Sequence, residues 1–178
     1  MPPAGDRPVI TPLPGGGDLG LVDALAQLTF AVQSALGRIA AAHDLSIVQI
    51  RLLGILRDRR PAINDLARLL QLDKSSVTGL VDRAEERGLV RRTPSALDRR
   101  SVQVTITAAG QELIGQGTAA FEAEIAALVA DLSPSQRSRL SATASRIVAT
   151  DARRRGIDIL SVEPASAEGS EGSEAVRR

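Results

Sequence analysis

The change of hydrophobic period at Gly88 constrains the fold of this chain more than any other feature of its sequence. Before Gly88 the apolar residues recur at spacings of three and four, as on one face of a helix, at Val77, Leu80, Val81 and Ala84. After it they alternate with polar residues, as in a strand, at Val102, Val104 and Ile106. Residues 89–93 can pair with that strand. The sequence therefore predicts a helix followed by a β-hairpin.

Two short helices are predicted in front of the hairpin. Asp73 precedes Lys74 and can accept hydrogen bonds from the free N–H groups of a first helical turn, while Leu72 packs on Val77. Upstream, residues 63–70 form a short amphipathic helix, and residues 71–73 join the two. A connection of this length is typical of a helix-turn-helix.

The second helix has a polar face, and an arginine-rich loop follows it. That face, which is expected to enter a DNA major groove, consists of Lys74, Ser75, Ser76, Thr78, Gly79, Asp82 and Arg83. The hairpin loop, residues 94–100, is interpreted as a wing. Five arginines lie between Arg87 and Arg100 against the single acid Asp98, although the whole chain carries a net charge of only +1. Such a local concentration of cations favours phosphate binding.

These features have other interpretations when each is taken alone. A pair of short helices occurs in the core of many folds, and only the alternating strand and the arginine loop favour duplex binding. Arg91 and Arg92 alternate along a strand, so at most one of them faces DNA easily and the other is expected in a surface ion pair. Residues 153–155 are interpreted mainly as cations at a helix end.

From about Ile47 to Thr107 the chain resembles the MarR family of multiple antibiotic resistance regulators. The resemblance rests on Ile63-Asn64-Asp65-Leu66-Ala67, on residues 74–83, on Glu86-Arg87-Gly88-Leu89-Val90 and on Asp98-Arg99-Arg100 with the strand to Gly110. It implies that Arg100, with Arg99 beside it, enters the minor groove and that Asp98 orients it. The implied fold class is mainly α with a small β-wing: a winged helix-turn-helix flanked by N- and C-terminal dimerisation helices.

The domain organisation follows from composition and helix signals. Residues 1–17 and 157–178 are expected to be disordered, because their Pro, Gly, Ser and Glu content buries little apolar area. Residues 18–44 are expected to form the N-terminal dimerisation helix, 45–106 the DNA-binding region and 107–156 two C-terminal dimerisation helices. Thr107 is a predicted N-cap, and Ser133 with Gln136 is a predicted capping box with Pro134 inside it.

A symmetric dimer is expected, because the helices at both ends have apolar faces that the winged helix is too small to cover. Two recognition helices related by a two-fold axis read an inverted repeat whose half-sites lie about 10 bp apart. The predicted partners are therefore double-stranded DNA with a pseudo-palindromic operator and a second copy of the chain.

An effector site is implied by the family resemblance alone. The resemblance implies a pocket for a small aromatic or anionic effector at the junction of the dimerisation and DNA-binding regions, and the candidate contacts are Phe30, His43, Ile50 and Leu53. Taken by itself, His43 beside Asp44 is better interpreted as a surface or capping residue than as a ligand contact.

Several function classes are disfavoured by composition. One histidine, no cysteine and no carboxylate cluster leave no recognisable catalytic or metal site, so we expect neither an enzyme nor a cofactor. Without an apolar run of about 18 to 20 residues or a signal-peptide pattern, we expect a cytoplasmic protein and no membrane partner.

The predicted function is a dimeric, sequence-specific transcriptional regulator, a repressor released by a small-molecule effector. The alternative is a winged-helix interaction or architectural module without ligand response, which Asp82 and Glu85 leave open.

Overall fold

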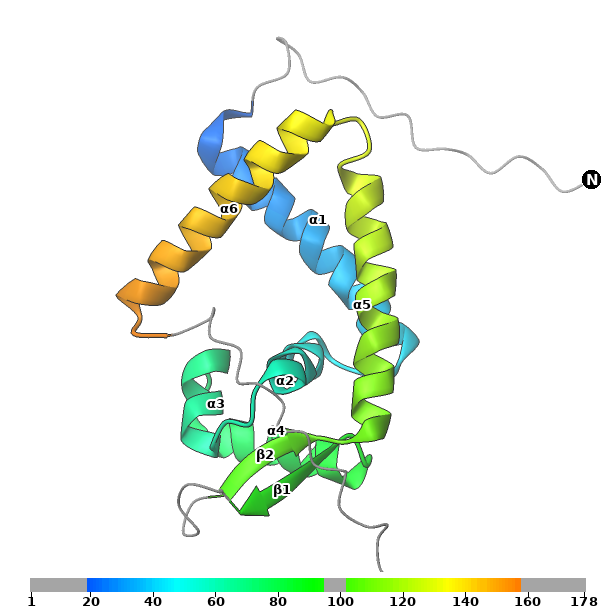
Figure 1. Ribbon diagram of the computed structural model, residues 1–178, viewed down its shortest axis with the longest axis vertical. Coiled ribbons are helices and arrows are strands. Elements are labelled where there is room, and N and C mark those ends of the chain that lie inside the picture. The colour runs from blue at the N-terminus through cyan, green and yellow to red at the C-terminus, as the bar shows by residue number, and fades with distance from the viewer. Residues whose placement is uncertain (1–18, 95–101, 158–178) are drawn as a thin grey trace, which may run out of the picture. The chain divides into compact units, whose positions relative to one another are not determined.

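The computed structural model describes residues 19–94 and 102–157, which are mainly helical with one small sheet (Figure 1). In chain order the elements are α1 (Gly20–Ala42), α2 (Ile47–Asp58), α3 (Ile63–Leu70), α4 (Lys74–Glu86), β1 (Val90–Pro94), β2 (Val102–Ile106), α5 (Ala108–Leu128) and α6 (Pro134–Arg154). The chain divides after Ser34 into two compact units, residues 1–34 and 35–178. The predicted fold class, mainly α with a small β-wing, is confirmed.

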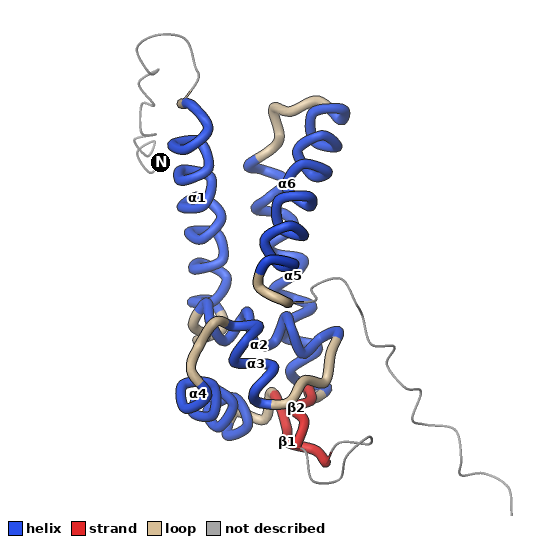
Figure 2. Tube along the Cα trace, turned by 90° about the vertical axis from the view of Figure 1, so that its left-hand side faces the viewer, coloured by secondary structure: helices blue, strands red, loops and turns tan. Residues whose placement is uncertain are grey.

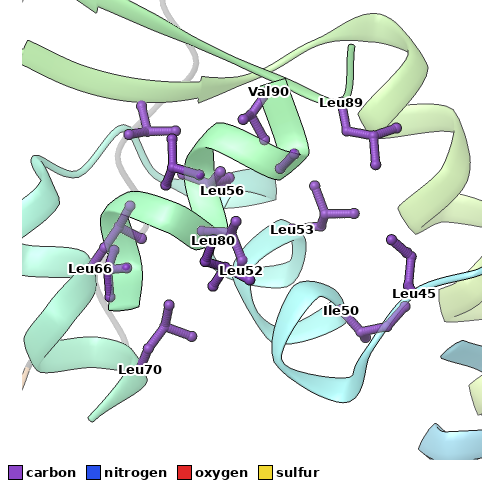
Figure 3. Packing of buried hydrophobic residues seen from close by; sticks show 14 of the residues in the cluster. Leu45, Ile50, Leu52, Leu53, Leu56, Leu66, Leu70, Leu80, Leu89 and Val90 are labelled. Atoms are coloured by element: carbon purple, nitrogen blue, oxygen red, sulfur yellow. The ribbon is translucent and has the colours of Figure 1, made fainter. Parts of the chain in front are cut away.

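One aliphatic core holds α2, α3, α4 and the hairpin together (Figure 3). Its fully buried side chains are Leu52, Leu53, Leu66, Leu70, Val77, Val81, Val90 and Val104. Burying an aliphatic side chain of this size stabilises a fold by roughly 1.5 to 3 kcal/mol. The core therefore fixes α4 from its apolar side and leaves the opposite side of that helix outside.

The change of period at Gly88 coincides with the end of α4, as the sequence predicted. Gly88 has φ of +69°, a left-handed conformation that costs glycine nothing. The N–H of Gly88 donates to the carbonyl of Glu85 at 2.8 Å and that of Leu89 to the carbonyl of Ala84 at 2.9 Å. These two hydrogen bonds form a Schellman motif, which ends the helix and leads the chain directly into β1.

The sheet is antiparallel, with Val90 opposite Ile106 and Pro94 opposite Val102. Pro94, which the sequence analysis placed in the hairpin loop, is the last residue of β1. A short third segment joins the sheet, because the N–H of Val104 donates to the carbonyl of Pro61 at 2.9 Å and Ala62 forms a β-bridge with Gln103. The next helix, α3, starts at Ile63, as the sequence predicted.

The N-termini of α5 and α6 carry the caps that the sequence predicted. Thr107 accepts from the N–H of Gly110 at 3.1 Å, and Ser133 and Gln136 form a reciprocal capping box with Pro134 in the first turn. Arg137 donates to the carbonyls of Ala130 and Leu132, each at 2.9 Å, and so closes the turn between the two helices. Figure 1 and Figure 2 show α5 leading away from the winged helix and α6 turning back toward it.

Large apolar side chains remain exposed on the helices outside the core. On α5 and α6 they are Leu128, Leu140, Ile147 and Val148, and on the α1 segment of the first unit they are Leu21, Val22, Leu25, Leu28 and Phe30. Among the described residues, no single helix has the length and apolar composition to cross a membrane, and only α1 and α2, taken as a bent pair, pass that criterion.

Candidate nucleic-acid interface

The recognition helix α4 begins at a heavily bonded carboxylate. Asp73 Oδ1 accepts from the N–H of Ser76 at 2.8 Å and from Ser75 Oγ at 2.5 Å, and Oδ2 accepts from Ser76 Oγ at 2.6 Å. The hydroxyls of Ser75 and Ser76 and the N–H of Ser76 hold the pKa of Asp73 well below its usual range. The predicted N-cap is confirmed, and its carboxylate stays ionised.

The cap gives a testable pH dependence of stability. Because the pKa of Asp73 is lowered in the folded chain, its contribution to stability is present above the unfolded pKa of about 3.9 and is lost as the pH falls through the folded value. In Asp73→Asn the amide still caps the helix but does not titrate. We expect the urea midpoint of the wild type to fall more than that of the variant between about pH 6 and about pH 2. Parallel curves would contradict the role given to Asp73.

The two faces of α4 divide as the sequence predicted. Val77, Leu80, Val81 and Ala84 are buried. The side chains of Lys74, Ser75, Ser76, Asp82 and Arg83 are exposed, and Thr78 and Gly79 are half-buried. All seven predicted contact residues therefore lie outside the core, and contact with DNA stays a prediction for each of them. The bare Cα of Gly79 lets the Arg83 guanidinium lie along the helix, 3.4 Å from the position of a Cβ.

Arg92 links β1 to the recognition helix. Its guanidinium forms ion pairs with Glu85 and, at 2.6 Å, with Asp82, and its backbone N–H donates to Glu85 at 2.9 Å. Arg92 is thus the ion-pair member of the two strand arginines, and Arg91 contacts the Thr105 hydroxyl across the sheet at 3.4 Å. Because the ion pair with Arg92 joins α4 to β1, Asp82 takes part in positioning the wing strand. No pattern in the sequence connects Asp82 with Arg92.

A second arginine ties the end of α4 to the turn between α1 and α2. Arg87 donates to the carbonyl of Asp44 at 2.6 Å and to that of His43 at 3.1 Å. Asp44 has φ of +52°, so the turn itself is tight. His43 is half-buried beside this contact, and its carbonyl rather than its imidazole accepts from Arg87. The Arg87 contact was not foreseen, because its acceptors are backbone carbonyls.

The wing tip lies outside the described residues. Asp98, Arg99 and Arg100 all fall between residues 95 and 101. Both strands that lead into the wing are described, and their register brings Pro94 opposite Val102. The predicted roles of these three residues stay predictions.

The candidate effector contacts differ in burial, and their role in binding an effector stays a prediction. Ile50 and Leu53 belong to the hydrophobic core, where they are 9% and 0% exposed, whereas Phe30 is 59% exposed and belongs to the first unit. A cavity of about 420 Å³ opens elsewhere, between α2, α3 and the end of α6. Its walls include Arg51, Gly54, Ile55, Leu69, Val148, Asp151, Ala152 and Arg155, and none of the four candidates lines it. No group of acidic or imidazole side chains within residues 19–94 and 102–157 could hold a metal ion.

The winged-helix part of the chain is similar in sequence to known transcriptional regulators. Residues 43–101 match the model of the MarR family. The HTH-type transcriptional regulator PecS of Dickeya dadantii is 28% identical over 100 residues, which cover 54% of this chain and 60% of PecS. The chain spans about half the length of the curated relatives it matches.

Solved structures share the fold over a longer part of the chain. The crystal structure of MarR superposes with a TM-score of 0.66 at 23% identity, covering 80% of this chain and 99% of MarR. CouR of Rhodococcus jostii RHA1, solved with bound p-coumaroyl-CoA, superposes with a TM-score of 0.60 at 25% identity, covering 70% of this chain and 88% of CouR. The described helices and hairpin therefore form a MarR-type winged-helix fold.

Proposed function

We propose that this chain, whose residues 43–101 match the MarR family model, is a dimeric, sequence-specific DNA-binding repressor that a small-molecule effector releases from its operator. The observation that carries the proposal is the division of α4, whose apolar side is locked in the core while its polar side is exposed. A helix anchored in this way can place its polar side in a major groove while its apolar side stays packed in the core. We place the protein in the cytoplasm and assign it no catalytic activity.

The proposed DNA contacts fall into two groups. The exposed or half-buried residues of α4 are proposed to face the major groove: Lys74, Ser75, Ser76, Thr78, Gly79 and Arg83. Asp82 is proposed to act there through its bond to Arg92. Asp98, Arg99 and Arg100 are proposed to act in the wing. Arg92 pairs with both Asp82 and Glu85 and offsets part of their negative charge, which favours DNA over the interaction module, whose main support was the acidity of this face.

Dimerisation is proposed through the helices that flank the winged helix, residues 18–44 and 107–156. Nearly every side chain of α6 is exposed in the protomer, including those of Leu140, Ile147 and Val148. Leaving such aliphatic side chains in water is unfavourable, and a second copy of the same face would bury them. The remaining segments, residues 1–17 and 157–178, are proposed to lie outside this assembly.

Effector release is proposed because of where the cavity lies. Its walls come from α2, α3 and α6, so a bound molecule would contact the helix-turn-helix and a proposed dimerisation helix together. CouR, which shares the fold, was solved with a bound CoA thioester. A ligand with different affinities for two spacings of the recognition helices would shift the protein between them.

The proposal is tested by selecting bound fragments of the native genome with the full chain. We expect enrichment of duplexes that carry an inverted repeat with half-sites about 10 bp apart, bound by a species of twice the protomer mass. Small phenolic acids are then screened for release of the enriched duplex. A monomer that enriches no fragment at low salt would contradict the proposal.

A further inference from the structure

The three hydroxyls on the exposed side of α4 all point their protons at acceptors within the protein. Ser75 and Ser76 donate to the Asp73 carboxylate at 2.5 and 2.6 Å, and Thr78 donates to the Lys74 carbonyl at 2.8 Å. An ionised carboxylate and a carbonyl oxygen can only accept, so each hydroxyl proton lies in its internal bond. What these side chains offer outward is therefore the lone pairs of their oxygens.

We infer that Asp73 determines base preference: by holding the protons of Ser75 and Ser76, it makes the first turn of α4 read the exocyclic amino groups of adenine or cytosine. The inference rests on the proposed DNA binding and specifies its chemistry. In the major groove, adenine N6 and cytosine N4 donate, whereas guanine O6 and N7 and thymine O4 accept. An acceptor-rich turn pairs with the first two bases and is repelled by the others.

Asp73 is the N-cap of α4, at the end of the helix whose first turn would meet the base edges in the major groove. Its oxygens already accept three hydrogen bonds, two of them from hydroxyls. Lys74, at the neighbouring position, is an exposed cation that can bind a phosphate or a guanine. The predicted preference therefore concerns the base pair next to Ser76 and leaves flanking pairs to other side chains.

A single substitution reverses the polarity of Ser76 while keeping the helix cap. In Asp73→Asn the amide oxygen must face the Ser76 N–H, because the amide nitrogen there would oppose another donor. The nitrogen then takes the place of Oδ2 and donates to Ser76 Oγ. The Ser76 proton is released to point outward, and the side chain becomes a donor for guanine or thymine.

The experiment is a selection from randomised synthetic duplexes with the wild type, Asp73→Asn, Ser76→Ala and the double variant. We expect the wild type to prefer adenine or cytosine at one position in each half-site and Asp73→Asn to prefer guanine or thymine there. One base contact changes discrimination by roughly 5- to 150-fold. In the Ser76→Ala background the second substitution should change nothing at that position.

Identical preferences of the wild type and Asp73→Asn would overturn the inference, as would a switch that persists without the Ser76 hydroxyl. A wild type that selects no duplex would overturn the proposed function and this inference together. A complementary measurement needs no variant: purine in place of the selected adenine, or 2-pyrimidinone in place of cytosine, removes the amino group alone. We expect roughly tenfold weaker binding by the wild type, and unchanged affinity would overturn the inference.

Discussion

Gly110→Ala is expected to destabilise the folded chain by about 3 kcal/mol, near the upper end of what overpacking costs. A Cβ on Gly110 would lie 2.2 Å from the carbonyl oxygen of Leu89 and 2.7 Å from Ile106 Cγ1. The Leu89 carbonyl belongs to backbone that is bonded on both sides, because it also accepts from the N–H of Thr107 at 3.0 Å. It has little freedom to move, so the strain spreads to α4, β1 and α5, which meet at this point. Urea unfolding followed by circular dichroism measures the change.

The matched control is Gly115→Ala in the same helix. A Cβ on Gly115 meets nothing within 4 Å, and Gly115 is exposed. Replacing an unconstrained glycine inside a helix should stabilise the chain by roughly 0.5 to 1 kcal/mol. The two substitutions are thus expected to act in opposite directions. Equal effects would show that the close approach of α5 to Leu89 is absent in solution.

Arg92→Ala is expected to lower the affinity for duplex DNA by roughly tenfold, although Arg92 is not itself a proposed DNA contact. Removing its guanidinium exposes the carboxylates of Asp82 and Glu85 on or beside the proposed phosphate-facing surface. The same change removes the ion-pair link between β1 and α4 and so loosens the wing. Stability should fall by only about 1 kcal/mol, because the partners are one third to one half exposed.

Two further variants separate charge from positioning. If the exposed carboxylates cause the loss, adding Asp82→Asn and Glu85→Gln to Arg92→Ala should restore most of the affinity. Arg57→Ala breaks an ion pair of similar exposure with Asp58 at the end of α2, outside the proposed DNA contacts, and should leave DNA binding unchanged. A wild-type affinity in Arg92→Ala, measured by fluorescence anisotropy, would exclude any role of the Arg92 network in binding.

Local signals in the sequence predicted the helices, the hairpin and most of the caps. The periods on either side of Gly88, the Asp73 cap and the Ser133 capping box depend on residues close together in the chain, where spacing alone determines geometry. The capping box of α2, in which Ser46 and Gln49 bond reciprocally, has the same sequence signature but is not among the predicted caps.

The remaining features of the site depend on contacts between distant segments. The network of Arg92 joins residues up to ten positions apart, and Arg87 reaches backbone carbonyls more than forty positions away. Every residue has a backbone carbonyl, so the acceptors of Arg87 cannot be recognised from sequence. Many carboxylates in the chain could pair with Arg92, so its partners cannot be recognised either. The cavity between α2, α3 and α6 is likewise a product of helix packing, whereas Ile50 and Leu53, proposed for an effector pocket, belong to the core.

A salt series tests most directly whether α4 and the wing bind double-stranded DNA through their clustered lysine and arginine side chains. The full chain is titrated against a selected duplex and against its separated strands between about 50 and 200 mM salt, with Arg100→Ala in parallel. With six to ten phosphate contacts, duplex affinity should fall by roughly 10³- to 10⁵-fold, and Arg100→Ala should reduce the logarithmic slope by about 1. Affinity that does not change with salt, or that is equal for single strands, would contradict the claim.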